Sequence, residues 1–216
     1  MQEHVFLLHG LGRTKSIMAK MDDSLCQQGF YTHNLEYPST QKPVEALAPL
    51  IWEHVRPISV REDCRIHFVG HSLGAIITRY LLQHHRIKNL ARVVMMGPPN
   101  HGSEVVDFFM RFSFYRRLYG PAGLQLGTKN NPLLASLPDA IDAEVGIIAG
   151  DHSVDKLYSW FLLKGPNDGK VTVFSTKLAR MKDHIVVHAA HPFLPNDPTV
   201  ILQTKYFLST GHFQRS

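Results

Sequence analysis

The stretch Arg65-Ile66-His67-Phe68-Val69-Gly70-His71-Ser72-Leu73-Gly74-Ala75-Ile76-Ile77 decides the fold of this chain. Residues 65–69 are expected to form a strand, and residues 74–84 have helical spacing. Between them, Ser72 lies on a sharp strand-to-helix turn, and glycines two positions before and after it let the strand and helix approach closely. The stretch predicts a nucleophilic serine; the alternative is a glycine-rich turn that holds a helix cap.

Working outward, short apolar runs alternate with helical patterns, which predicts a mostly parallel sheet with helices on both faces. We expect about six strands, drawn from residues 5–8, 31–37, 65–69, 91–96, 144–149, 171–175 and 185–188. Helices are expected over residues 16–27, 43–55, 74–84 and 198–208. The last has Asp197 at its cap position and Pro198 at its first turn.

The composition is that of an ordinary globular protein. The 216 residues are 44% hydrophobic, and 23 Lys and Arg against 18 Asp and Glu give a net charge of +5. A chain of this length can bury one sizeable core, so we expect a single domain over residues 1–216. The modest net charge, without a run of five like charges, argues against a nucleic-acid partner.

The two cysteines and the amino terminus favour a cytoplasmic location. Cys26 and Cys64 do not form a disulfide framework. The opening Met-Gln-Glu-His is followed by only four apolar residues, too few for a secretory signal. No stretch approaches the roughly 20 apolar residues of a membrane span.

A serine nucleophile needs a base, a carboxylate that orients the base, and donors for the oxyanion. The amide of Leu73 follows the serine at the start of a helix, and Leu11, in His9-Gly10-Leu11-Gly12 at the end of the first strand, offers a second amide. We expect both amides to contact the substrate. The carboxylate and the base follow the serine in the order Asp, then His.

Asp168 and His191 fit that order. Asp168 occupies a Pro-Asn-Asp-Gly turn, and His191 lies beyond the final strand, on a loop expected to be neither helix nor strand. Asp168 as an ordinary surface turn residue is one alternative, and Asp151 is the rival carboxylate. The rival histidines are His184, His188 and His212, of which His188 is expected within the last strand.

Nucleotide and metal sites fit the sequence poorly. The third glycine of a dinucleotide loop would fall at Lys15, and a phosphate loop over residues 165–170 is one residue short and has Val171 in place of Ser or Thr. The histidines His67, His71, His184, His188 and His191 do not form the H-E-x-x-H pattern of zinc enzymes. We expect no cofactor and no catalytic metal.

Residues 103–143 interrupt the strand–helix alternation and are expected to form a small cap inserted over the sheet. Their segment 108–119 is rich in Phe and Tyr, accompanied by Arg111, Arg116 and Arg117. A cap over an apolar acyl pocket explains this composition best. The alternative is a membrane-surface helix that makes a weak contact with lipid.

These motifs resemble those of the α/β-hydrolase superfamily, and within it the bacterial lipases and esterases. His9-Gly10-Leu11-Gly12 is similar to the oxyanion strand end, Gly70-His71-Ser72-Leu73-Gly74 to the lipase elbow, and Asn167-Asp168-Gly169-Lys170-Val171 to the acid turn. Pro98-Pro99-Asn100-His101-Gly102-Ser103 resembles a Pro-x-x-x-Gly-Ser step after the fourth strand. The resemblance implies an α/β-hydrolase fold and an acyl-enzyme mechanism, with Ser72, Asp168 and His191 as triad and the Leu11 and Leu73 amides as oxyanion donors.

The departures from that pattern narrow the expectation. Secreted lipases of this group carry a calcium-binding carboxylate two residues after the catalytic histidine, where this chain has Phe193, so no structural calcium is expected. The insertion is short for a full lid, which favours a small esterase for short to medium acyl esters over an interfacial triglyceride lipase. The partner would then be a small or lipid-like acyl ester.

Two alternative functions stay open. A thioesterase or acyltransferase would use the same fold and nucleophile. A non-catalytic hydrolase-like binding protein usually lacks Ser, His or Asp, and none is missing here. The oligomeric state does not follow from the sequence.

Overall fold

The computed structural model describes residues 1–154 and 156–215, except the side chains of residues 156–158. Within these residues, six strands form one sheet of order β2-β1-β3-β4-β5-β6, and every neighbouring pair is parallel. The strands are β1 (Gln2–Leu8), β2 (Tyr31–Leu35), β3 (Cys64–His71), β4 (Leu90–Met96), β5 (Glu144–Gly150) and β6 (Asp183–Val187). The predicted parallel sheet is confirmed.

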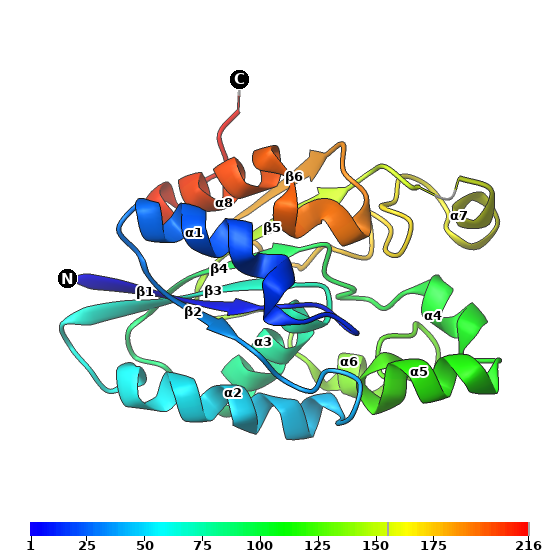
Figure 1. The fold of residues 1–216 in the computed structure, drawn as a ribbon, viewed down its shortest axis with the longest axis horizontal. Helices are drawn as coiled ribbons and strands as arrows, with labels where there is room; N and C mark the ends of the chain where they lie inside the picture. Colours follow the sequence, from blue (N-terminus) through cyan, green and yellow to red (C-terminus); the bar gives the residue numbers. More distant parts are fainter. Residues whose placement is uncertain (155, 216) are drawn as a thin grey trace.

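Helices cover both faces of this sheet (Figure 1). They are α1 (Ala19–Gln27), α2 (Val44–Ser59), α3 (Leu73–His84), α4 (Glu104–Phe109), α5 (Ser113–Leu124), α6 (Pro132–Ser136), α7 (Lys156–Leu162) and α8 (Pro198–Thr210), with 3-10 helices η1 (Lys15–Met18) and η2 (His191–Asn196). Helices α1 and α8 pack on one face and α2 and α3 on the other, while α4, α5 and α7 lie beyond the carboxyl ends of the strands. None of the described helices is long and apolar enough to cross a membrane.

The core is divided by the sheet into two layers, as the two-residue period of a strand requires. In β1, Val5 and Leu7 join the apolar cluster under α1 and α8. Phe6 and Leu8 join the cluster under α2 and α3. All four side chains are fully buried, because both faces of a parallel sheet are covered.

The cap of the last helix is confirmed. The Asp197 carboxylate accepts hydrogen bonds from the amides of Thr199 and Val200, at 2.8 and 3.1 Å. Pro198 occupies the first turn, where a missing N–H costs no helical bond. Helix α8 is thereby fixed directly after η2, which carries His191.

The predicted strand over residues 171–175 is wrong: these residues form turns with one isolated bridge from Thr172 to Asn167. Their alternating apolar pattern is typical of a strand, but local groups take their backbone donors. The amide of Val171 donates to the Asp168 carboxylate at 2.8 Å, and that of Val173 donates to the Pro166 carbonyl at 2.9 Å. Without free donors the segment cannot join the sheet ladder.

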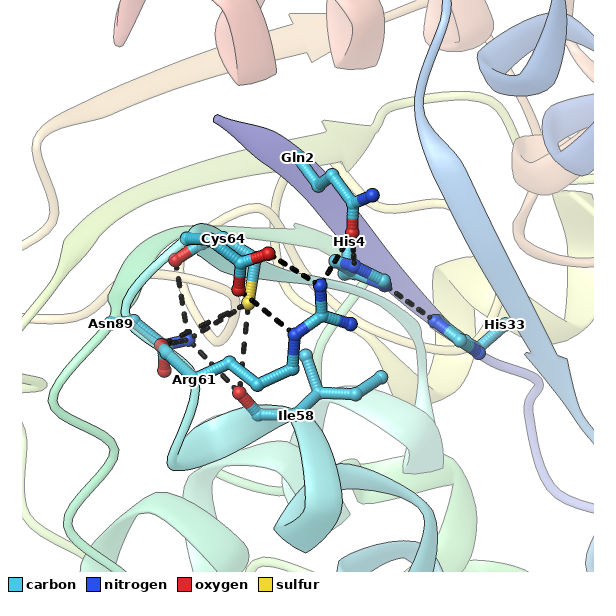
Figure 2. Close-up of polar contacts among 8 residues, drawn as sticks. Gln2, His4, His33, Ile58, Arg61, Cys64 and Asn89 are labelled. Carbon is cyan, nitrogen blue, oxygen red and sulfur yellow. Dashed lines mark hydrogen bonds and ion pairs between the residues drawn. The ribbon is translucent and has the colours of Figure 1, made fainter.

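A polar cluster lies at the amino ends of the strands, opposite the elbow (Figure 2). The Asn89 side-chain amide donates to the carbonyls of Ile58 and Arg61 at 3.1 Å and of Cys64 at 3.3 Å. The Arg61 guanidinium donates to Gln2 at 2.9 Å. These bonds tie the end of α2 to the starts of β1 and β3, the strands that carry the predicted oxyanion loop and elbow.

Several histidines are buried, and burial opposes their protonation. Burial lowers the pKa of His9 and of His67, and it lowers the pKa of His71 well below the usual histidine value. In Figure 2, the rings of His4 and His33 share a hydrogen bond of 2.9 Å, which requires that at least one of them is neutral. The native state therefore binds fewer protons than the unfolded chain below the ordinary histidine pKa of about 6.5.

We therefore expect the free energy of unfolding to fall as the pH drops from 7 to 5. With a folded pKa below the unfolded one, each buried histidine contributes a slope of up to about 1.4 kcal/mol per pH unit, beginning near pH 6.5. Urea unfolding at pH 5, 6, 7 and 8 measures this slope. His71→Gln should make it shallower, whereas the exposed His212→Gln should not. Constant stability from pH 7 to 5 would contradict the prediction.

Candidate active site

Ser72 lies on a strained turn between β3 and α3. Its φ of +53° is in the left-handed region, which among the described residues other than glycine only Asn130 shares. A Cβ atom at Gly70 would lie 2.6 Å from the Ala75 amide nitrogen, and one at Gly74 would lie 2.4 Å from the Leu8 carbonyl oxygen. Both glycines are therefore needed to bring the helix this close to the strands, as the sequence predicts.

Ser72, His191 and Asp168 form one hydrogen-bonded chain. The Ser72 Oγ lies 3.0 Å from the His191 Nε2, and the His191 Nδ1 lies 2.6 Å from the Asp168 Oδ2. Because an ionised carboxylate can only accept a hydrogen bond, the proton lies on Nδ1, which donates to Asp168. In the neutral ring, Nε2 then accepts a hydrogen bond from the Ser72 hydroxyl. The structure thus brings together the three side chains that the sequence nominates.

Asp168 is held by its own turn. Its Oδ1 accepts from the amides of Lys170 and Val171 at 2.9 and 2.8 Å, which leaves Oδ2 for the histidine. The carboxylate is fully buried. A surface role for Asp168 is thereby excluded, and the Asn-Asp-Gly sequence explains the position, since Gly169 takes a φ of +91°.

His191 begins the 3-10 helix η2, so the expected irregular loop is wrong at this point. Both backbone groups of His191 are bonded to residues outside this short helix. Its amide donates to the Asp168 carbonyl at 2.9 Å, and its carbonyl accepts from the His71 Nε2 at 3.0 Å. The backbone of His191 is therefore fixed by Asp168, which also binds its ring, and by His71, which directly precedes Ser72.

The rival residues lie elsewhere. His188 follows β6 rather than lying within it, and its side chain is 78% exposed and pairs with Asp151 at 3.0 Å. His184 lies in the first half of β6, 3.1 Å from the Thr176 hydroxyl. His212 is exposed after α8. The structure gives none of these three histidines a contact with Ser72.

The two residues predicted to supply oxyanion amides lie near the serine: Leu73 follows it directly in the chain, and Leu11 lines the same cavity. Leu73 is the first residue of α3, so its N–H has no carbonyl one turn earlier to bond. Leu11 and Gly10 line the same cavity as Ser72. The His9 ring, stacked on Tyr37 with centroids 4.0 Å apart, donates from Nδ1 to the Gly10 carbonyl at 2.9 Å. This buried support fixes the loop that carries the Leu11 amide.

His71 is a site residue whose role the sequence did not reveal. Its ring is buried against His191, with ring centroids 5.0 Å apart, and its Nε2–H holds the His191 carbonyl. Burial, followed by the charge of His191, lowers the pKa of His71 well below the usual value, so the ring stays neutral. The signal in the sequence was its position directly before the serine.

Gly97, after β4, is a second residue that sequence reasoning missed. Its φ is +54°, and a Cβ there would lie 3.0 Å from the Asp168 Oδ2 and 3.1 Å from the His191 Nδ1. A side chain at this position would press on the hydrogen bond between the acid and the base. Only the tertiary structure reveals this, because Gly97 is far in sequence from both partners.

The segment 98–103 ties the acid turn to the end of β4. The Ser103 hydroxyl donates to the Lys170 carbonyl at 2.6 Å, and the Asn100 amide donates to the Thr176 carbonyl at 2.7 Å. The buried Arg79 guanidinium in turn donates to the Asn100 carbonyl at 3.2 Å. Burial lowers the pKa of Arg79 to about 10. This network connects α3, behind Ser72, with the turn that carries Asp168.

A cavity of about 180 Å³ opens beside the Ser72 hydroxyl. Its walls include Gly10 and Leu11 after β1 and His71 at the elbow. The predicted cap contributes Val105, Val106, Tyr115, Tyr119 and Leu126. The lining is mostly apolar around a few polar groups, as is usual for a small-molecule site. The insertion therefore lines the space in which a substrate of Ser72 would lie.

The histidines considered as metal ligands have other partners. His67 Nε2 lies 2.5 Å from Glu3, and His71 and His191 belong to the network around Ser72. In the part of the chain that the structure describes, no group of three or more His, Cys, Asp or Glu side chains is arranged to hold a metal ion.

Comparison with known proteins gives structural neighbours only. No protein-family model and no curated protein matches the sequence. The mature lipase BlEst2 of Bacillus licheniformis superposes with a TM-score of 0.75 at 17% identity, over 97% of this chain and 92% of that one. A monoacylglycerol lipase of Paleococcus ferrophilus superposes with a TM-score of 0.65 at 15% identity, over 96% of this chain and 94% of that one. An extracellular α/β-hydrolase of a Paenibacillus species superposes with a TM-score of 0.61 at 13% identity, over 96% of this chain and 98% of that one.

These superpositions cover nearly the whole of each chain and agree with the sheet order described above. They establish the α/β-hydrolase fold that the sequence motifs predict.

Proposed function

Starting from the α/β-hydrolase fold, we propose that this protein is a serine carboxylic-ester hydrolase that acts on short to medium acyl esters through an acyl-enzyme. The observation that carries the proposal is the hydrogen-bonded chain from the Ser72 hydroxyl through His191 to the buried Asp168. Nucleophile, base and orienting acid in this order are the requirement for serine acyl transfer. The apolar cavity beside Ser72 supports an acyl group as the substrate portion bound there.

In the proposed reaction, the Ser72 oxygen attacks the ester carbonyl while the His191 Nε2 takes the hydroxyl proton. The negative charge that develops on the carbonyl oxygen is stabilised by the amides of Leu11 and Leu73. His191 then gives its proton to the departing alkoxide, which leaves an acyl-serine. Water attacks the acyl-serine with His191 again as base, so that the carboxylic acid is released and Ser72 regains its proton.

The assignment of the acid is tested by replacing each aspartate with asparagine. Asp168→Asn should lower turnover by up to about 10⁴-fold, because an amide facing Nδ1 favours the wrong imidazole tautomer. The matched Asp151→Asn should cost little, because Asp151 pairs with the exposed His188. Steady-state rates on one soluble ester measure both. If Asp151→Asn were the more damaging change, the assignment would be wrong.

The substrate class is tested with p-nitrophenyl esters from acetate to palmitate. Efficiency should rise with acyl length while methylenes still enter the cavity, each worth up to about 0.8 kcal/mol, and then fall once the cavity is filled. We expect the maximum at short to medium chains. The matching acyl thioesters should be slower substrates. Activity on none of the esters would count against the proposal, and faster turnover of thioesters would favour a thioesterase.

A further inference from the structure

Exposed Phe and Trp side chains are confined to a few segments of the molecule. In the described part of the chain, every exposed Phe or Trp lies on one of four segments at the carboxyl ends of the strands: Phe112 and Phe114 at α5, Trp160 and Phe161 in α7, Phe174, and Phe193 in η2. We call these six residues, together with Leu118 of α5, the rim. Phe114 and Trp160 are each 75% exposed, which is costly for side chains of this size in water.

Helix α5 is apolar on two sides. Tyr115 and Tyr119, one turn apart, line the cavity, whereas Phe114 and Leu118, also one turn apart, are exposed. An apolar substrate in the cavity accounts for Tyr115 and Tyr119. It does not account for the exposure of Phe114 and Leu118 to solvent. Figure 1 shows α5 and α7 beyond the carboxyl ends of the strands, apart from the helices that cover the two faces of the sheet.

Aromatic rings connect the cavity with the rim. Consecutive ring centroids lie 4.3 to 5.8 Å apart along one path, which runs through Tyr119, Tyr115, Phe109, Phe108 and Phe112. Val154 and Phe109 line a hollow next to the cavity, together with Pro192, which precedes Phe193. The rim is therefore continuous with the entrance to the site around Ser72.

The charges around the rim are mostly positive; the acidic residues near it include Glu104 and Asp107 of α4 and Asp151. Residues 110–136 contain Arg111, Arg116, Arg117 and Lys129 and no acidic residue. Residues 159–177 contain Lys164, Lys170 and Lys177, and their single acidic residue, Asp168, is buried against His191. Asp151, which lines a hollow with Trp160, is paired with His188. Exposed aromatic groups among cations are the combination that binds at the surface of anionic lipid bilayers.

We propose that the rim docks on the surface of an anionic lipid bilayer and so holds the mouth of the cavity at the lipid–water interface. The exposed rings would enter the headgroup region, while the arginines and lysines meet the lipid phosphates. A second copy of the chain fits the rim less well, because a symmetric contact would place the same cations against each other. The catalytic consequence rests on the proposed function: docking would bring Ser72 to acyl esters that partition into the bilayer.

Vesicle binding tests the docking without depending on catalysis. We expect the protein to co-sediment with phosphatidylcholine vesicles that contain phosphatidylglycerol, to bind pure phosphatidylcholine weakly, and to lose affinity as salt screens the charges. Ser72→Ala should bind like the wild type. Equal binding to both kinds of vesicle, or binding to neither, would overturn the proposal whether or not the protein hydrolyses esters.

Paired variants locate the contact. Phe114→Ser with Trp160→Ser, and separately Arg116→Gln with Arg117→Gln, should each weaken binding to the anionic vesicles on the order of tenfold. The matched controls are Leu202→Ser with Tyr206→Ser, which are exposed on α8, and the exposed Arg56→Gln with Arg86→Gln. The controls should bind normally. Hydrolysis of a dissolved short ester, unchanged in all variants, would show that folding and the Ser72 site are intact.

Trp160 also provides a direct signal. In Trp52→Phe it is the only remaining tryptophan of the chain, and its emission should shift to the blue when anionic vesicles are added, because the ring leaves water. An unchanged spectrum with bound vesicles would overturn the proposal. A second outcome would also overturn the proposal: the protein forms a concentration-dependent dimer, the Phe114→Ser and Trp160→Ser changes dissociate this dimer, and vesicle binding persists in the changed protein.

Discussion

Ser72→Ala should abolish covalent labelling of the protein by a fluorophosphonate and lower ester turnover by about 10⁴- to 10⁶-fold. A serine hydroxyl that donates to a neighbouring imidazole attacks phosphorus as it attacks an ester carbonyl, and Ser72 is 3.0 Å from the His191 Nε2. Mass spectrometry of the labelled protein should place the adduct on the peptide that contains Ser72.

The control for labelling is Ser209→Ala, on the exposed end of α8, which should be labelled at Ser72 like the wild type. The stability of Ser72→Ala should change little, because alanine removes only the hydroxyl from the turn and keeps its Cβ. A Ser72→Ala protein that is still labelled on another serine would show that the elbow does not carry the nucleophile.

His191→Ala should lower ester turnover by a factor similar to that of Ser72→Ala, because the two side chains act as one unit. Without the imidazole, no group near the Ser72 hydroxyl accepts its proton during attack. The double variant with Ser72→Ala should therefore be scarcely slower than either single variant. Steady-state and burst kinetics on a p-nitrophenyl ester would measure the three rates.

The matched control is His188→Ala, three residues earlier. Its side chain is exposed and pairs with Asp151, so turnover should stay near that of the wild type. Near-normal turnover in His191→Ala, combined with loss in His188→Ala, would move the base to His188. That result would also require a different arrangement of the chain after β6.

The elbow is the part of the site that local sequence fixes. Gly70 is needed because a Cβ there would collide with the Ala75 amide five residues later, a requirement that can be read from a strand, a turn and a helix in series. The matching requirement at Gly74 comes from the neighbouring strand β1, because a Cβ there would collide with the Leu8 carbonyl. The Asp168 turn is local in the same sense, since Asn-Asp-Gly supplies both the turn and the carboxylate that caps it.

The failed strand over residues 171–175 shows where local pattern stops being sufficient. Its alternation of apolar and polar residues fits a strand, but the side chain of Asp168 and the segment 98–103 claim its hydrogen-bonding groups. The Ser175 backbone carbonyl, for example, accepts from the His101 amide at 3.1 Å. A pattern cannot reveal that a distant segment competes for the same bonds.

The sequence by itself determined the parallel sheet, the elbow and the nomination of Ser72, Asp168 and His191, because strand and helix periods and turn chemistry depend on neighbouring residues. Only the tertiary structure shows how the two Asp–His pairs lie: Asp168–His191 is buried beside Ser72, where Gly97 leaves space and His71 holds the backbone, whereas Asp151–His188 is exposed to solvent. It likewise decided which aromatic residues of the insertion line the cavity and which form the rim. Burial depends on contacts between segments far apart in the chain, and no local pattern specifies these contacts.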